Sequence, residues 1–147
     1  MVEIPSVVLM AELFAQEVDF FSIGTNDLTQ YTFAAERTNA NVAHPTDALH
    51  PAMLGQVKKV IDAGHDAGIW TGMCGELAGD PDAIPILLGL GLDKFSIGSR
   101  LIPQAKAIIR RWNLADAQAL AERALKMRSA SEVRAASAVA NASTEPA

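Results

Sequence analysis

The segment Asp19-Phe20-Phe21-Ser22-Ile23-Gly24-Thr25 is the most informative in the chain, because it recurs 74 residues later as Asp93-Lys94-Phe95-Ser96-Ile97-Gly98-Ser99. Each copy contains a short run of mostly apolar residues that a glycine ends, which is typical of a buried parallel strand. A third such run, Ile69 to Met73, lies between the two copies, and helical patterns separate the runs. This alternation predicts parallel strands joined by right-handed crossovers.

With Met1 to Ile4 read as one more strand, the sequence predicts four strand–helix units, the last strand being Lys94 to Ile97. Longer helices are expected over Pro5 to Gln16, from about Asn26 to Glu36, over Pro51 to Ala67, over Leu101 to Trp112 and over Leu114 to Met127, with a loop over Thr38 to Leu49. A short helix is expected to start at Asp80-Pro81, with Asp80 as its cap, and to be stopped by Gly89 and Gly91. Four parallel strands fit either an open doubly wound sheet or half of an eight-stranded barrel. The repeat favours an α/β fold of the barrel type, because each unit then places the end of its strand on one rim.

The C-terminal region is expected to lie outside this α/β unit. Ser129-Ala130-Ser131-Glu132 is a capping-box pattern that predicts the start of a short helix. We therefore expect a partial barrel over residues 1–128, a terminal helix over 129–137 and a disordered tail over 138–147, where there is little to bury.

The composition narrows the class of protein. Half of the residues are hydrophobic and 20% are charged, which is typical of a globular chain. A net charge of −5 argues against nucleic acid or an anionic membrane as the main partner. One cysteine excludes an intramolecular disulfide, and there is no basic leader or membrane-length apolar run. We expect a soluble, cytoplasmic protein.

The residues that directly follow the strands are the candidates for chemistry, because they face the active-site rim of a barrel. In chain order they are Glu3, Gly24-Thr25-Asn26-Asp27, Cys74-Gly75-Glu76 and Gly98-Ser99-Arg100. Glu3 and Asp27 together suggest a Mg²⁺ site, since Mg²⁺ takes one or two carboxylates and completes its shell with water and substrate oxygens. The alternative is that both carboxylates cap helices or face helix dipoles.

The strongest local signal is the segment from Gly24 to Gln30. The glycine permits a sharp turn, and the helix start that follows presents free N–H groups to an anion. Arg37, about three turns further on, is a candidate for binding phosphate through its planar guanidinium, with a solvated helix end as the alternative.

Cys74 follows the middle strand and precedes a glycine. A lone cysteine is most often a small buried apolar residue. At a strand end, however, a thiol that is protonated at neutral pH can serve as a proton donor, and no basic residue lies near it in sequence to make it a nucleophile.

The remaining polar and aromatic residues carry weaker signals. The histidines at 44, 50 and 65 show no metal-binding spacing and are expected in loops or on the surface. Glu76 is interpreted as a structural residue or as one that lies behind the residues that contact the ligand. Arg100 is interpreted as a structural residue or as one that lines the rim. Trp70 and Trp112 are expected to pack in the core or between helices.

Three stretches resemble consecutive motifs of the phosphoenolpyruvate-utilising enzymes. They are Met1 to Pro5, Val18 to Tyr31 and Gly72 to Asp80, in the family's order and spacing, and the similarity extends from Met1 to about Leu125. Within that family, Tyr31 to Arg37 and Cys74 to Ala78 look like enzyme I, the phosphoenolpyruvate-protein phosphotransferase branch of the bacterial sugar phosphotransferase system. Both stretches differ from pyruvate phosphate dikinase and phosphoenolpyruvate synthase.

The resemblance implies roles for particular residues. Glu3 and Asp27 match magnesium ligands, Asn26 and Asp27 match a segment that contacts phosphoenolpyruvate, and Arg37 matches an arginine that binds the substrate phosphate. Cys74 matches the acid that protonates the enolate of pyruvate. The phosphoryl group would pass to an enzyme histidine and then to a phosphocarrier protein.

The resemblance also implies that parts of such an enzyme lie outside this sequence, namely the histidine domain and the first half of the barrel. We therefore expect a fragment, starting within the barrel, that does not complete phosphotransfer alone and that pairs with a second copy or with the remaining barrel. The alternatives are a non-catalytic assembly or binding module and a fragment of a related enzyme such as the dikinase.

Overall fold

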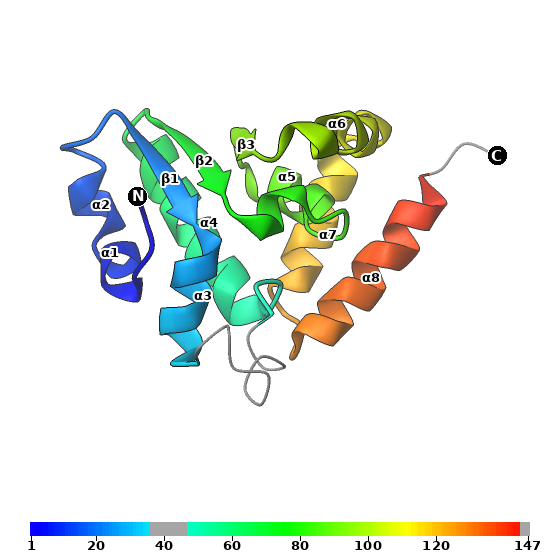
Figure 1. The fold of residues 1–147 in the computed structure, drawn as a ribbon, viewed down its shortest axis with the longest axis horizontal. Helices are drawn as coiled ribbons and strands as arrows, with labels where there is room; N and C mark the ends of the chain where they lie inside the picture. Colours follow the sequence, from blue (N-terminus) through cyan, green and yellow to red (C-terminus); the bar gives the residue numbers. More distant parts are fainter. Residues whose placement is uncertain (36–46, 145–147) are drawn as a thin grey trace.

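The protein folds around a small parallel sheet whose strands follow the order of the chain (Figure 1). The computed structural model describes residues 1–35 and 47–144. Its strands are β1 (Phe20–Gly24), β2 (Trp70–Cys74) and β3 (Lys94–Ser96), and both strand pairs are parallel. Val2 adds an isolated parallel bridge to Ile23, with Val2 N donating to the Ser22 carbonyl at 2.8 Å. The strand expected over Met1 to Ile4 is therefore reduced to this bridge.

Helices connect and cover the strands. They are α1 (Pro5–Leu9), α2 (Ala11–Phe14), α3 (Thr25–Phe33), α4 (Pro51–Asp66), α5 (Ile84–Leu90), α6 (Ile102–Arg111), α7 (Leu114–Ala124) and α8 (Ala130–Ser143), with the 3₁₀ turns η1 (Glu76–Gly79) and η2 (Ser99–Leu101). The parallel arrangement of consecutive strands confirms the predicted α/β class. Within the described residues no helix is long and apolar enough to cross a membrane.

Helix α4 shows how the sequence pattern forms the core. The helical spacing of Leu54, Val57, Val60 and Ile61 predicts one apolar stripe. In the structure this stripe is fully buried, and α4 packs against β1 and β2. Pro51 occupies the first turn, and the His50 ring caps the helix by accepting from Ala52 N at 3.1 Å.

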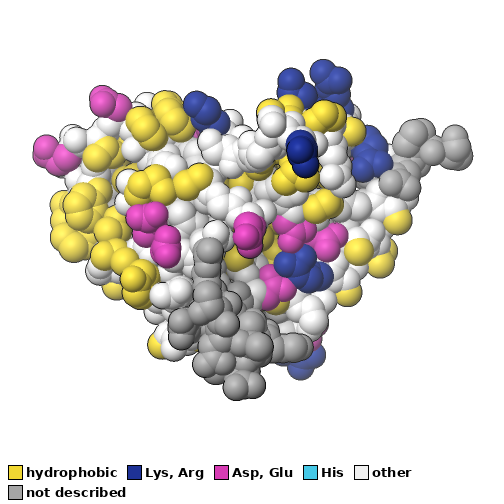
Figure 2. Space-filling model, viewed as in Figure 1, with side chains coloured by type: hydrophobic (Ala, Val, Ile, Leu, Met, Phe, Trp, Pro, Cys, Tyr) yellow, Lys and Arg dark blue, Asp and Glu magenta, His cyan; other side chains and the backbone are white. Residues whose placement is uncertain are grey.

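The first helix was expected to be continuous, and this was wrong. The backbone leaves the helical conformation at Met10 (φ −105°, ψ 16°), which separates α1 from α2. The break allows Val8, Ala11 and Ala15 all to be buried, while larger side chains of the segment stay exposed. These exposed apolar side chains are Ile4, Leu9, Met10, Leu13 and Phe14. Figure 2 shows hydrophobic surface over the part of the molecule that contains α1 and α2.

Helix α5 also differs from its prediction at both ends. Asp80 does not cap the helix: its carbonyl accepts from Ala83 N and Ile84 N in a turn, and α5 begins at Ile84. Gly91 ends the helix in the left-handed conformation (φ 93°), as expected, but Gly89 lies inside it. The reason is packing, since a β-carbon at Gly89 would lie 2.0 Å from the carbonyl oxygen of Ala117 in α7.

Helix α8 extends beyond the expected limit of residue 137. It continues to Ser143, so the prediction of a disordered tail from residue 138 was wrong for Ala138 to Ser143, while residues 145–147 lie outside the described part. The extension is docked by Asn141, whose Oδ1 accepts from Trp112 Nε1 at 3.0 Å and whose Nδ2 donates to the Pro81 carbonyl at 3.1 Å. The predicted cap is confirmed, with Ser129 Oγ accepting from Glu132 N at 3.3 Å.

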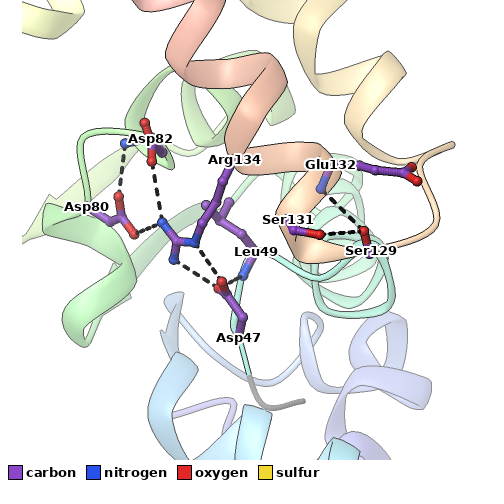
Figure 3. Close-up of polar contacts among 8 residues, drawn as sticks. All are labelled: Asp47, Leu49, Asp80, Asp82, Ser129, Ser131, Glu132 and Arg134. Carbon is purple, nitrogen blue, oxygen red and sulfur yellow. Dashed lines mark hydrogen bonds and ion pairs between the residues drawn. The ribbon is translucent and has the colours of Figure 1, made fainter. Parts of the chain in front are cut away.

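Arg134 of α8 joins three acidic side chains from two loops (Figure 3). Its guanidinium contacts Asp47 through Nε (2.6 Å) and Nη2 (2.9 Å), and its Nη1 contacts Asp80 (2.8 Å) and Asp82 (3.5 Å). Burial acts to raise the pKa of Asp47, but hydrogen bonds from Arg134 and from Leu49 N lower it further than burial raises it. This ionic cluster fixes α8 against the loops before α4 and α5.

The cluster predicts an acid-sensitive contribution to stability. Because the pKa of Asp47 is lower in the folded than in the unfolded chain, its stabilising effect is present above the unfolded value and is lost as pH falls below about 4. We expect Arg134→Ala to reduce the free energy of unfolding at pH 7 by about 1–2 kcal/mol, and by less at pH 3. Urea denaturation at both pH values measures this. Arg128→Ala is the control, because that side chain is 89% exposed and pairs only with Glu132 among the described salt bridges. An equal loss at both pH values would contradict the prediction.

The close contact between α5 and α7 predicts opposite effects for two glycine substitutions in helices. A β-carbon added at Gly55 in α4 would meet no atom within 4 Å, so Gly55→Ala should stabilise the protein by about 0.5–1 kcal/mol through helix propensity. Gly89→Ala has the same propensity gain but forces α7 away, and should destabilise by about 2–4 kcal/mol. Thermal unfolding followed by circular dichroism compares the two, and a stabilised Gly89→Ala variant would refute the packing argument.

Candidate functional site

The carboxyl ends of the strands meet at one edge of the sheet. The register places Gly24 of β1 beside Cys74 of β2, and Cys74 beside Ser96 of β3. The segments that leave this edge are α3, η1 and the turn at Gly98, which leads into η2. The sequence-predicted candidates Glu3, Asn26, Asp27 and Cys74 are therefore all within two or three residues of the same edge.

Glu3 lies over the end of β1 because Gly24 has no side chain. A β-carbon at Gly24 would be 2.6 Å from Cγ and 2.9 Å from Oε1 of Glu3. Glu3 is half-buried, and the bridge at Val2 fixes its backbone beside β1. Asp27 is exposed in the first turn of α3, three residues after Gly24. The two carboxylates thus belong to the same strand end, and Gly24 is the cradle that brings Glu3 there.

The start of α3 is held against the end of β2 by a second close approach. Thr25 is fully buried, and its Oγ1 has no hydrogen-bond partner among the described residues. A β-carbon at Gly75 would lie 2.6 Å from this oxygen and 3.5 Å from Asn26 Oδ1. Gly75 also adopts φ 120° and ψ 174°, a conformation that is essentially restricted to glycine.

The cavity at this edge has a volume of about 320 Å³. Its lining includes Asn26, Glu76, Gly79, Gly98 and Leu101, so α3, η1 and η2 all contribute to it. Asn26 was a predicted site residue, whereas Gly79 and Leu101 were not. Their pairing is visible only in three dimensions, where a β-carbon at Gly79 would lie 2.8 Å from Leu101 Cδ1.

Cys74 is half-buried, with its sulfur between two groups of β1. Ser22 Oγ donates to Sγ at 3.6 Å, and Sγ donates to the Ile23 carbonyl at 3.7 Å. The sequence interpretation did not single out Ser22. The period of two along a strand is the signal that was available, because it places Ser22 on the same face as Gly24, which neighbours Cys74.

Other predicted residues lie elsewhere. Arg37 and His44 are outside the described residues. His65 Nε2 contacts Asp93 Oδ2 at 2.9 Å, and that carboxylate also accepts from Thr71 N, near the amino ends of β2 and β3. Although burial acts to raise the pKa of Asp93, these two hydrogen bonds lower it. Arg100 is exposed in η2.

The two tryptophans occupy different surroundings. Trp70 is stacked on Phe20 at 4.2 Å between ring centroids and is 39% exposed, so it is not a core residue here. Trp112 packs between helices, as expected.

The described residues contain no group of three or more His, Cys, Asp or Glu side chains arranged to hold a metal ion. A Mg²⁺ site formed by two carboxylates is compatible with this, because water and substrate oxygens supply the other ligands. Glu3 and Asp27 have the right chemistry, and the Gly24 cradle directs one of them to the strand end.

Comparison with known proteins gives consistent matches. Residues 1–114 match the family described as PEP-utilising enzyme, PEP-binding domain. The phosphoenolpyruvate-protein phosphotransferases of Haemophilus influenzae and Staphylococcus carnosus are each 53% identical to the chain over 133 residues, and that of Priestia megaterium is 54% identical. Each alignment covers 90% of this chain and 23% of the relative, so the chain spans less than a quarter of the length of these curated relatives.

The close approach at Gly75 predicts a severe effect of one methyl group. Gly75→Ala should reduce the free energy of unfolding by about 2–4 kcal/mol, because it combines backbone strain with a clash against Thr25. Gly98→Ala is the matched control: Gly98 also lines the cavity, but its φ of −56° suits alanine and an added β-carbon would meet no atom within 4 Å. Chemical denaturation of the two variants tests this, and equal stabilities would be inconsistent with the described contact.

Proposed function

The chain belongs to the PEP-utilising enzymes, through their PEP-binding domain, and from this premise we propose that it forms the phosphoenolpyruvate-binding part of a phosphoenolpyruvate-protein phosphotransferase. The observation that carries the proposal is the common strand edge at which Glu3, Asn26 and Cys74 gather, with Asn26 lining the cavity at that edge. Such an enzyme transfers the phosphoryl group of phosphoenolpyruvate to one of its histidines and then to a phosphocarrier protein.

We propose further that the segment at Val2 and the strands β1, β2 and β3 are the last four strands of a (β/α)₈ barrel. Their parallel pairing in chain order supports this. The exposure of one sheet face also supports the barrel. Phe20 and Trp70 are stacked on the face that carries Cys74, and they are 46% and 39% exposed. In a closed barrel this face would point inward, and further strands would cover the aromatic pair.

Glu3 and Asp27 would hold Mg²⁺ at the end of β1. When bound, Mg²⁺ would supply positive charge to the phosphate and enolate oxygens of the substrate. Gly24 supports this assignment, because it leaves room for the Glu3 side chain to cross the strand end. Without a metal ion, the carboxylates of Glu3 and Asp27 would repel an anionic substrate. The metal and the substrate would therefore bind together.

Asn26, Asp27 and Arg37 would bind phosphoenolpyruvate. Asn26 lines the cavity, and the free N–H groups in the first turn of α3 suit an anion. Arg37 would contribute two parallel hydrogen bonds to the phosphate. After the phosphoryl group leaves, the Cys74 thiol would give its proton to the methylene carbon of the enolate, producing pyruvate.

The phosphoryl-accepting histidine is not expected among the described residues. His50 is engaged as the cap of α4, and His65 pairs with Asp93 near the amino ends of β2 and β3, away from the cavity. We therefore expect the isolated chain to bind phosphoenolpyruvate without phosphorylating the carrier protein.

A second function, assembly without catalysis, is favoured by one observation. Apolar side chains over α1 and α2 are exposed (Figure 2). Phe20 and Trp70 are exposed as well, and exposed apolar surface of this kind often pairs with another polypeptide. The partner would be a second copy of the chain or the remaining part of the barrel. Dimerisation without ligand binding would favour this function over the first.

Calorimetric titration with phosphoenolpyruvate, with and without Mg²⁺, tests the proposal. We expect binding that requires Mg²⁺ and that weakens about tenfold or more in Asp27→Asn, because one of two metal ligands is lost. Asp66→Asn is the matched control, since it removes the same charge from an exposed position at the C-terminal end of α4. Binding that is indifferent to Mg²⁺, or equally weakened in both variants, would contradict the metal assignment.

A further inference from the structure

The sulfur of Cys74 has two hydrogen-bonding neighbours on β1, and they have different roles. Sγ donates a hydrogen bond to the Ile23 carbonyl at 3.7 Å, while Ser22 Oγ donates a hydrogen bond to Sγ at 3.6 Å. The carbonyl can interact only with the protonated thiol, because it is an acceptor. The hydroxyl can interact with the thiol and, more strongly, with the thiolate, since hydrogen bonds to charged groups are the stronger ones.

The sheet register explains why Ser22 reaches the sulfur. Ser22 lies directly opposite Gly72, which has no side chain to contact, and Cys74 is the diagonal neighbour two residues further along β2. On the other side of Cys74 lies Ser96 of β3, which is exposed and makes no described hydrogen bond to the sulfur. Two serines therefore flank one cysteine, and one of them donates to it.

We propose that Ser22 is a positioning residue for Cys74, whose hydroxyl holds the sulfur and stabilises the thiolate that remains after proton donation. This inference rests on the proposed role of Cys74 as the acid. In that step the S–H bond breaks and its electron pair stays on sulfur. The enolate double bond supplies the pair that forms the new C–H bond. A proton from water later restores the thiol.

The single cysteine of the chain makes the interaction measurable without substrate. Iodoacetamide alkylates the thiolate, so the alkylation rate at pH 7 depends on the thiolate fraction multiplied by its nucleophilicity. A stabilising hydrogen bond raises the fraction more than it lowers the nucleophilicity. We expect Ser22→Ala to slow alkylation about threefold at pH 7. At pH 10, where thiols are largely ionised, the deficit should disappear.

Two further variants separate this role from a purely structural one. Ser22→Thr keeps a hydroxyl on the strand and should retain the wild-type rate at pH 7. Ser96→Ala removes the other flanking hydroxyl and should leave the rate unchanged. The charged side chains on the elements around Cys74 include Glu3, Asp27, Glu76 and Lys94, with Arg100 on η2 and Lys58, Lys59, Asp62, His65 and Asp66 on α4, which packs against β2. All of them are the same in every variant, so their effect on the thiolate cancels in the comparison.

The proposal is overturned if Ser22→Ala reacts at the wild-type rate at pH 7, if its deficit is the same at pH 10, or if Ser96→Ala slows alkylation equally. Circular dichroism of each variant confirms the fold. If Ser22→Ala is unstable, Ser22→Val replaces it, because valine has the shape of threonine without the hydroxyl; alkylation as fast in Ser22→Val as in Ser22→Thr at pH 7 would then overturn the proposal. The phosphoenolpyruvate titration, run on the wild-type chain, reports separately on the proposed function. A normal titration with no Ser22 effect therefore rejects only the present inference.

Discussion

Parallel pairing of β1 with β2 is the constraint on which the rest of the site depends. It places Gly24 beside Cys74, so both strands end at the same level and their following residues share one edge. A slip of one residue would turn every side chain of β1 to the opposite face. Ser22 would then point toward the helices, and the buried Phe21 and Ile23 would point away from them. Burial of Phe21 and Ile23 therefore also determines which side chains of β1 face Cys74.

Two glycines convert this shared edge into a compact site. At Gly24 the missing side chain admits Glu3, and at Gly75 it admits Thr25 and the start of α3. The two positions need glycine for different reasons. Gly24 needs it only to leave space for Glu3, whereas Gly75 also has a positive φ that favours glycine. The segments that carry Glu3, Asn26 and Cys74 are thereby held close together by the backbone.

Local patterns predicted much of this fold. The repeat around Ser22 and Ser96 identified β1 and β3, and the apolar period identified α4 and its buried face. What the patterns did not predict depends on contacts between distant segments. The break at Met10 follows from which side chains reach the core, and the Arg134 cluster joins residues more than fifty positions apart. For the site, strand ends indicated Glu3, Asn26 and Cys74, but the partners of these residues required the register.

The charge at the edge bears on how an anion could bind there. Glu3, Asp27 and Glu76 lie in segments at this edge, and the chain as a whole carries a net charge of −5. An isolated helix start offers about half of a positive charge, which cannot offset several carboxylates. A cation shared by two of those carboxylates changes the sign of the local field and leaves coordination positions for the ligand. Acting as metal ligands, as proposed, would make these acidic residues compatible with an anionic substrate, and this links the metal proposal and the substrate proposal physically.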